Sequence, residues 1–127
     1  AEELDPKNPK TVCAQGSAYR KMKQFDKAVE LYKKAIELDH MYFVCYDNLG
    51  LAYAEMGKDK EAEESFFKAT RIAPRYADAW YNLGALYDLK LDNKERAVWA
   101  YEEYIALGKD AELIKEVKER VKKIKGN

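Results

Sequence analysis

The sequence predicts an all-α solenoid built from stacked pairs of antiparallel helices, and two observations support this prediction. The first is a leucine–glycine–tyrosine pattern that recurs at an interval of 34 residues, as Leu49, Gly50 and Tyr53 and again as Leu83, Gly84 and Tyr87. The second is that apolar residues around these motifs lie three or four positions apart, which is the spacing of one face of a helix. A fixed period of this length is typical of equivalent units that share one continuous core.

The first complete unit is predicted over residues 9–42, with helices over about 9–22 and 26–38. Pro9 suits the first helical turn, where the N–H group that proline lacks would be unpaired in any case. Gln15, Gly16 and Tyr19 stand one period before the second copy of the pattern. The second helix has a predicted inward stripe of Ala28, Leu31, Tyr32, Ala35 and Leu38.

The second and third units are predicted over residues 43–76 and 77–110. We expect helices over about 43–56 and 60–72, then a first helix carrying the third copy of the pattern and a second helix over about 94–107. One residue is inserted within 89–93, a connection that can absorb it. Tyr104 replaces the alanine of the earlier units, which indicates that this last helix packs differently.

Both ends of the chain depart from the repeat. Residues 1–8 match the end of a second helix one period later, so we expect them to be the end of a preceding repeat and the chain to be a fragment of a longer array. Residues 111–127 carry no copy of the pattern. They predict a capping helix over about 111–125 that begins after the N-cap Asp110. Its apolar stripe is Leu113, Val117, Val121 and Ile124.

Three glycines stand inside predicted helices, at Gly16, Gly50 and Gly84. Each lowers helix stability by about 1 kcal/mol relative to alanine. This cost is understandable if a neighbouring helix approaches where a side chain would clash. We therefore interpret the alanines and aromatic residues of the partner helices as the packing that surrounds these glycines.

Together, Trp80, Leu83, Gly84 and Tyr87 form a W-x2-L-G-x2-Y motif that resembles the tetratricopeptide repeat (TPR) family, and the resemblance covers nearly the whole chain. It implies a right-handed superhelix whose concave groove, lined by the first helix of each unit, binds a peptide or helix of a partner protein. The chain departs from the family pattern at Val12, Gln15, His40, Tyr46 and Tyr104.

The resemblance places the groove on fifteen positions of this sequence. They are Lys10, Cys13, Ser17, Arg20 and Lys21 in the first unit, Val44, Asp47, Asn48, Leu51 and Glu55 in the second, and Asp78, Tyr81, Asn82, Ala85 and Asp88 in the third. The helical spacing independently supports four of these positions. Asp47, Asn48, Tyr81 and Asn82 lie off the core stripe, so we expect packing not to require them.

Some members of this family bind the C-terminal carboxylate of a chaperone with lysine, arginine and asparagine side chains. The corresponding positions here are Cys13 and Ser17, then Asn48, then Asp78 and Asn82. Only Asn48 matches, and Asp78 would repel a carboxylate. We therefore predict that the chain does not bind the acidic C-terminal tails of cytosolic chaperones.

The charge order along the predicted groove suggests a hypothesis about its ligand. Arg20 and Lys21 make the first unit basic, whereas Asp47, Asp78 and Asp88 make the later part acidic. A ligand with the opposite charge order would fit. Apolar contact between the charged ends would come from Val44, Leu51 and Tyr81.

The composition argues against several other classes of protein. The 23 basic and 23 acidic residues cancel, whereas a nucleic-acid-binding face is basic. Cys13 and Cys45 lack metal-ligand spacing and His40 is alone, so we expect no metal, no cofactor and free thiols. No pair of nucleophile and base is visible, so we expect no catalytic residues and no enzyme activity.

No apolar run is long enough for a membrane span, so we expect a soluble and, by preference, cytoplasmic protein. Two alternative functions stay open. The exposed edge of the first unit could pair two copies of the chain in a homo-oligomer. A helical repeat of this length could also bind RNA, although the neutral charge makes that the weaker alternative.

Overall fold

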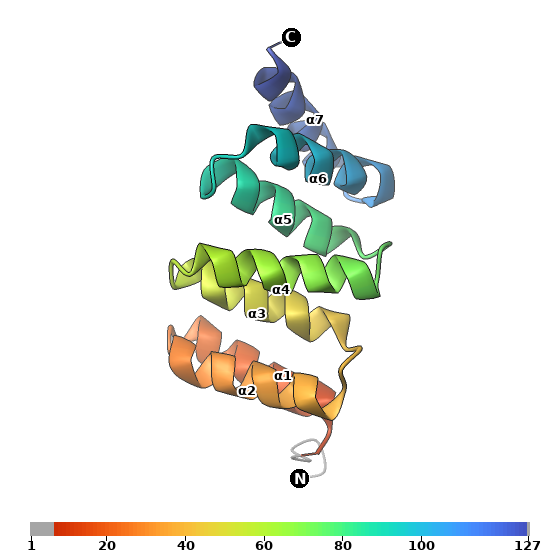
Figure 1. Cartoon of the computed structure of the whole chain (residues 1–127). Coiled ribbons are helices and arrows are strands. Elements are labelled where there is room, and N and C mark those ends of the chain that lie inside the picture. Colours follow the sequence, from red (N-terminus) through yellow and green to blue (C-terminus); the bar gives the residue numbers. More distant parts are fainter. Residues whose placement is uncertain (1–6, 127) are drawn as a thin grey trace.

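The computed structural model describes residues 7–126 and contains, within that range, seven α-helices and no strand. They are α1 (Pro9–Lys21), α2 (Phe25–Leu38), α3 (Phe43–Glu55), α4 (Asp59–Ile72), α5 (Ala77–Leu89), α6 (Lys94–Leu107) and α7 (Ala111–Lys125). Figure 1 shows the helices stacked in chain order, with the two termini at opposite ends of the stack. This arrangement confirms the predicted all-α solenoid.

The predicted helix bounds are close to the observed ones. Residues 94–107 and 111–125 form helices as predicted, and four other predicted bounds differ by one residue. For example, α1 ends at Lys21 because Met22 is already the C-cap. The predicted helix end within residues 1–8 falls mostly on residues 1–6, which lie outside the described residues.

The three helical glycines mark where paired helices approach most closely. A methyl group on Gly50 would lie 2.6 Å from the Phe66 ring, and one on Gly84 would lie 2.5 Å from the Tyr101 ring. At Gly16 the corresponding distance to the Tyr32 ring is 2.9 Å. This contact confirms the interpretation of these glycines, because an aromatic ring of the second helix occupies the space of the missing side chain.

The core continues from pair to pair through small and aromatic side chains. Ala35, Ala52 and Ala79 are fully buried, and Tyr87 is almost so. One member of the predicted stripe departs from it, because Leu38 is 42% exposed. Leu38 is the last residue of α2, where its side chain faces solvent instead of a neighbouring helix.

Helix α7 packs against α6 and buries one face. The Asp110 side chain accepts a hydrogen bond from the backbone N–H of Leu113 at 3.2 Å, which confirms the predicted N-cap. Val117 and Val121 are buried, whereas most other residues of α7 are exposed. Tyr104 is buried under this helix, and its ring lies 5.5 Å from the ring of Tyr81.

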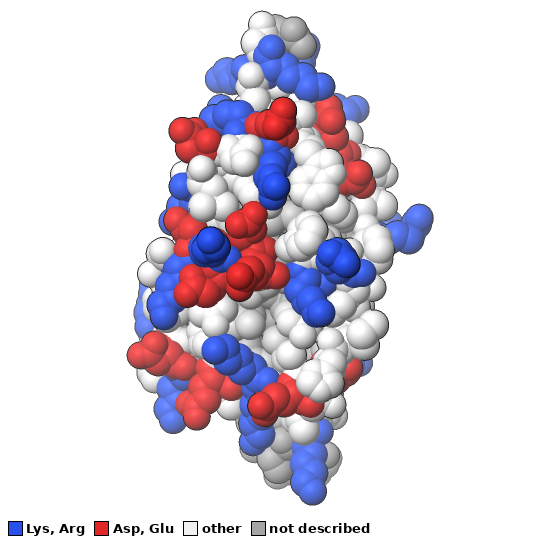
Figure 2. Space-filling model, in the orientation of Figure 1, with Lys and Arg blue, Asp and Glu red and all other residues white. Residues whose placement is uncertain are grey.

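The face formed by α2, α4 and α6 carries charges of both signs. Figure 2 shows acidic side chains gathered over the first half of α4 and basic side chains over its second half. This order matches the helix dipole, whose positive end favours acidic residues such as Asp59 and Glu61 in the first turn of α4. The mixed charges indicate an ordinary solvated surface on this side of the stack.

Candidate functional site

The candidate site lies on the surface shared by α3 and α5, on the opposite side of the stack from the solvated face of α2, α4 and α6. Two adjoining hollows occur there, and we name them the acidic pocket and the apolar pocket. Both are lined by Leu51 of α3 and Asn82 of α5. Because they share these two residues, the pockets adjoin, and we refer to the two together as the groove.

The acidic pocket has a volume of about 290 Å³ and is closed by the C-terminal part of the stack. Its walls come from α3, the loop before α5, α5 itself, α6 and α7. The lining residues are Asp47, Asn48, Leu51, Tyr76, Asp78, Tyr81, Asn82, Tyr104 and Leu113. Six of the predicted groove residues are therefore brought together in this one place.

Asp47 is the buried carboxylate of the acidic pocket and is only 4% exposed. Its Oδ1 accepts a hydrogen bond from Asn82 Nδ2 at 3.0 Å, and its Oδ2 accepts one from the Tyr76 hydroxyl at 3.5 Å. Asp47 is outside the apolar core, as expected, but its burial was not predicted. Tyr76, in the loop before α5, covers it, and helix periodicity does not show the position of a loop residue.

Burial makes the charged form of Asp47 unfavourable. The pKa of Asp47 is raised from 3.8 to about 6, chiefly because burial removes the carboxylate from water. The nearby negative charge of Asp78 acts in the same direction, while the hydrogen bond from Asn82 opposes the shift. Asp78 itself is exposed in the first turn of α5. The pocket therefore has one buried and one exposed carboxylate on neighbouring helices.

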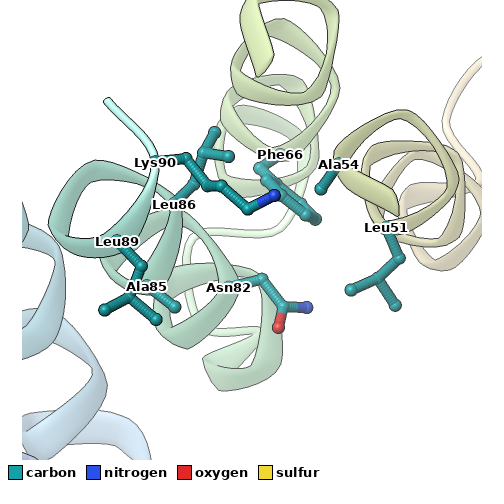
Figure 3. A pocket seen from close by; sticks show the side chains of 8 residues that line it. All are labelled: Leu51, Ala54, Phe66, Asn82, Ala85, Leu86, Leu89 and Lys90. Carbon is teal, nitrogen blue, oxygen red and sulfur yellow. The ribbon is translucent and has the colours of Figure 1, made fainter. Parts of the chain in front are cut away.

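The apolar pocket lies beside it, towards the end of α5, and has a volume of about 160 Å³. It is lined by Leu51, Ala54, Phe66, Asn82, Ala85, Leu86, Leu89 and Lys90. Figure 3 shows the side chains of α3 and α5 around this space, with Phe66 at its back. Leu89 lies at its edge and is 71% exposed.

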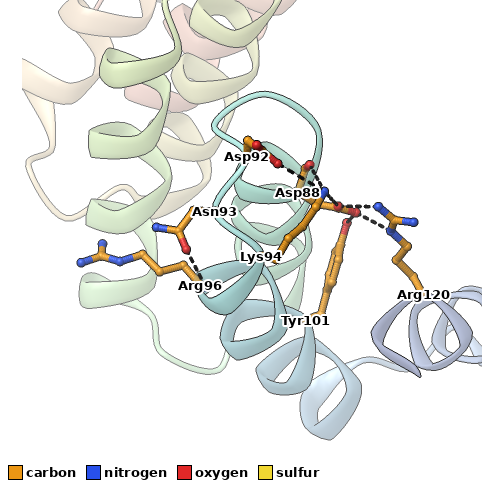
Figure 4. Close-up of polar contacts among 7 residues, drawn as sticks. All are labelled: Asp88, Asp92, Asn93, Lys94, Arg96, Tyr101 and Arg120. Carbon is orange, nitrogen blue, oxygen red and sulfur yellow. Dashed lines mark hydrogen bonds and ion pairs between the residues drawn. The ribbon is translucent and has the colours of Figure 1, made fainter. Parts of the chain in front are cut away.

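Asp88 is the predicted groove residue that the structure places elsewhere. It is buried, and its carboxylate accepts hydrogen bonds from Arg120 Nη2 and Lys94 Nζ at 2.7 Å each. The Tyr101 hydroxyl and Arg120 Nε also donate to it, at 3.0 and 2.8 Å. Figure 4 shows these groups converging from α5, α6 and α7.

The expectation that Asp88 offers a negative charge to a ligand is therefore wrong. The hydrogen bonds from Arg120 hold its pKa well below the usual range, and those from Lys94 and Tyr101 act in the same direction. The repeat pattern does not predict this network, because the helix that carries Arg120 stands outside the repeat. The basic residues of this helix indicated that it could pair with an acidic residue, but periodicity does not show which one.

The basic end of the predicted groove is also partly neutralised. Arg20 Nη1 forms an ion pair with Glu55 Oε1 at 2.9 Å, and the Ser17 hydroxyl shares a hydrogen bond of 2.9 Å with the hydroxyl of Tyr32. Lys21 is exposed and Val44 is half-buried. None of the predicted residues Ser17, Arg20, Lys21 and Val44 lines either pocket.

The two thiols lie beneath the groove and are free. Cys13 and Cys45 are both buried, as expected for unpaired core cysteines. Asn48 Nδ2 donates to the Cys13 sulfur at 3.6 Å, so two of the positions compared with the carboxylate-binding members contact each other. Within residues 7–126, no group of three or more potential ligands is arranged to hold a metal ion.

No helix among the described residues has the length and apolar character required to cross a bilayer. Sequence comparison then places the chain in a family. A profile described as "TPR repeat" matches residues 16–57 and 50–90, and one described as "Tetratricopeptide repeat" matches residues 77–109. The curated protein bimA of Emericella nidulans is 27% identical over 96 residues, which are 74% of this chain and 12% of that protein.

Solved structures share the fold. The TPR domain of Arabidopsis OM64 superposes with a TM-score of 0.83 at 24% identity, covering 93% of this chain and 97% of that one. The first TPR of Spaghetti (RPAP3), solved with an HSP90 peptide SRMEEVD, gives a TM-score of 0.82 at 24% identity, covering 98% and 96%. By its profile matches, its repeated motif and its stacked helix pairs, this chain belongs to the tetratricopeptide repeat family.

Proposed function

We propose that the groove on α3 and α5 binds a peptide or helical segment of a partner protein. Members of this family generally mediate protein–protein interaction. The observation that carries the proposal is that an apolar and an acidic pocket adjoin on these helices, with Leu51 and Asn82 in both linings. A recess with apolar walls and a few convergent polar groups is the usual form of a binding site.

The test is a selection of peptides from a random library displayed on phage, followed by calorimetry with the recovered peptides. Leu51→Arg fills the junction of both pockets with a long charged side chain, so we expect it to weaken binding at least tenfold, which corresponds to about 1.4 kcal/mol. Met41→Arg is the control, because Met41 is 64% exposed and lines neither pocket. Equal binding by both variants would contradict the proposal.

We also propose that the ligand is not an acidic C-terminal tail. Asp78 and the buried Asp47 give the acidic pocket a negative charge, and Cys13 is buried where carboxylate-binding members have a basic residue. The peptide SRMEEVD, bound by the first TPR of Spaghetti, is the direct probe. We expect no heat of binding with this chain, and micromolar affinity would contradict this part of the proposal.

We further propose that the chain is a binding module without catalytic activity. The groove carboxylate Asp47 is hydrogen-bonded to an amide and a phenol, and neither group serves as an acid–base partner near neutral pH.

A second candidate function is self-association through the first repeat. Tyr19 and Leu31 are half-buried, whereas Tyr53 and Ser65, one period later, are buried between helix pairs. A hollow of about 360 Å³ lined by Tyr19, Leu31 and polar neighbours occurs at this edge. Sedimentation equilibrium tests it. A monomer at all concentrations would exclude pairing, and Tyr19→Glu should abolish any dimer.

A further inference from the structure

We propose that the groove selects segments in which a lysine or arginine lies beside a large apolar side chain. The cationic group would enter the acidic pocket while the apolar side chain fills the apolar pocket. This inference rests on the proposed function and adds the chemical class of the ligand. It replaces the charge order predicted from the sequence, because two members of that set have partners within the chain.

The charges of the acidic pocket are the first part of the argument. Within residues 7–126, neither Asp47 nor Asp78 forms an ion pair with a basic side chain. The hydrogen bonds to Asp47 come from the neutral groups of Asn82 and Tyr76. Arg20 of α1 exerts a favourable but small influence on Asp47, and it is already paired with Glu55.

The burial of Asp47 strengthens this argument. A buried carboxylate without a cationic partner is unfavourable, and a bound cation removes much of that penalty. The raised pKa of Asp47 reports the same penalty. Asp88 makes the contrast within this chain, because it is equally buried but is held by Arg120 and Lys94. Asp47 is therefore as buried as a carboxylate in an ion pair, but it has no cationic partner.

The apolar pocket supplies the second, independent part of the argument. Its volume of about 160 Å³ is close to that of a cavity of about 150 Å³ that accommodates a benzene ring. A leucine, isoleucine, methionine or phenylalanine side chain therefore fits. Leu89 remains 71% exposed at the edge, so an apolar side chain in the pocket would remove this surface from water.

The arrangement of the pockets requires the ligand's basic and apolar side chains to lie close together. Leu51 and Asn82 belong to both linings, so neighbouring side chains of one short segment can reach both. Lys90 also lines the apolar pocket, and Figure 3 shows its side chain reaching across this space towards Phe66. Its positive charge would repel a second cation there. The acidic pocket is thus the place for the cation, and it would repel the phosphates of nucleic acids or lipids.

The experiment begins with the peptides that a random phage-displayed library yields against the complete chain. We expect enriched sequences to carry lysine or arginine within a few positions of a large apolar residue. Enriched peptides that lack a basic residue, yet lose binding to Leu51→Arg, would overturn this inference and leave the proposed groove intact. A library that yields no peptide sensitive to Leu51→Arg would overturn both.

A charge exchange then tests the acidic pocket directly. We expect Asp78→Lys to weaken the binding of a selected peptide about tenfold. Replacing the peptide's basic residue with glutamate should recover most of this lost affinity for the Asp78→Lys variant, but should not improve binding to the wild-type chain. Asp26→Lys is the matched control, because Asp26 is also an exposed aspartate in the first turn of a helix but lies on α2. Unchanged binding by Asp78→Lys, or no recovery with the glutamate peptide, would contradict the inference.

Discussion

At the scale of single residues, the chain shows two opposite ways of burying an aspartate. Asp88 is neutralised within the fold, whereas Asp47 is held by neutral donors in the groove. A group that is unfavourable for folding and lies in a cleft is a candidate functional residue. The two carboxylates therefore should affect stability in opposite directions as the pH changes.

The first prediction concerns Asp47 and the free energy of unfolding. Its pKa is raised from 3.8 to about 6, so the folded state binds the proton more tightly than the unfolded state. Asp47 should therefore lower stability as the pH rises from about 4 to about 6, by about 1–3 kcal/mol. Asp47→Asn keeps an oxygen that can accept from Asn82, and its amide nitrogen can donate to the Tyr76 hydroxyl in place of the present bond. This variant should lack the loss and be more stable than the wild type at pH 8.

Urea unfolding of both proteins across this pH range measures the difference. The charged and titratable groups that face Asp47 are Asp78 of α5, Tyr76 before it and Arg20 of α1. Asp26→Asn is the control, because this aspartate is exposed on α2. The same decline in stability for wild type and Asp47→Asn would show that Asp47 is not the group responsible.

The second prediction concerns the packing at Gly50. Alanine should favour the helix by about 1 kcal/mol, but its methyl group would lie 2.6 Å from the buried ring of Phe66. Overpacking of a rigid core costs about 1–3 kcal/mol, so we expect Gly50→Ala to destabilise the chain. Thermal unfolding measures this change.

A compensating substitution separates steric clash from other causes. Phe66→Leu alone removes buried surface and should also destabilise the chain. If the clash is the cause, the double variant will be more stable than the sum of the two single effects predicts. Simple additivity would contradict the assigned role of Gly50.

At the scale of the helices, α7 is held by an ion pair to a buried carboxylate as well as by its apolar stripe. Arg120 of α7 reaches Asp88 of α5 across α6 with two hydrogen bonds. Because the pKa of Asp88 is lowered in the folded state, this contribution to stability is complete above about pH 4 and is lost as the pH falls below it. Acid should therefore loosen α7.

The third prediction tests this attachment. Arg120→Ala should increase amide hydrogen exchange across α7 at neutral pH, because Asp88 then keeps only Lys94 and Tyr101 as partners. Lys115→Ala removes an exposed charge from the same helix and serves as the control. Unchanged protection of α7 in Arg120→Ala would show that its apolar residues alone hold it in place.

Helices were the most predictable level of this structure. Periodicity and small residues predicted the paired helices and the close approach at Gly50 and Gly84, because both depend on local spacing along the chain. Two kinds of contact were not predictable. The capping helix has no counterpart that would assign a partner to Arg120, and Tyr76, which covers Asp47, lies in a loop outside any helical register.

At the scale of the whole molecule, the stack has two different sides. The side formed by α2, α4 and α6 is covered with interspersed charges (Figure 2). The side of α3 and α5 has an apolar pocket next to a negatively charged one. The sequence predicted which helices carry the groove, but only the three-dimensional structure shows that Asp88, one of its three expected acidic residues, is neutralised within the fold.

The most direct test of the account is nuclear magnetic resonance mapping of a selected peptide onto the labelled chain. We predict that the changes in amide chemical shift cluster at Leu51, Asn82 and Ala85 and at Asp47 and Asp78. The amides of α2 and α4 should change little. Shift changes centred on α2 and α4, or on the edge formed by Tyr19 and Leu31, would contradict the proposal that this groove is the binding site.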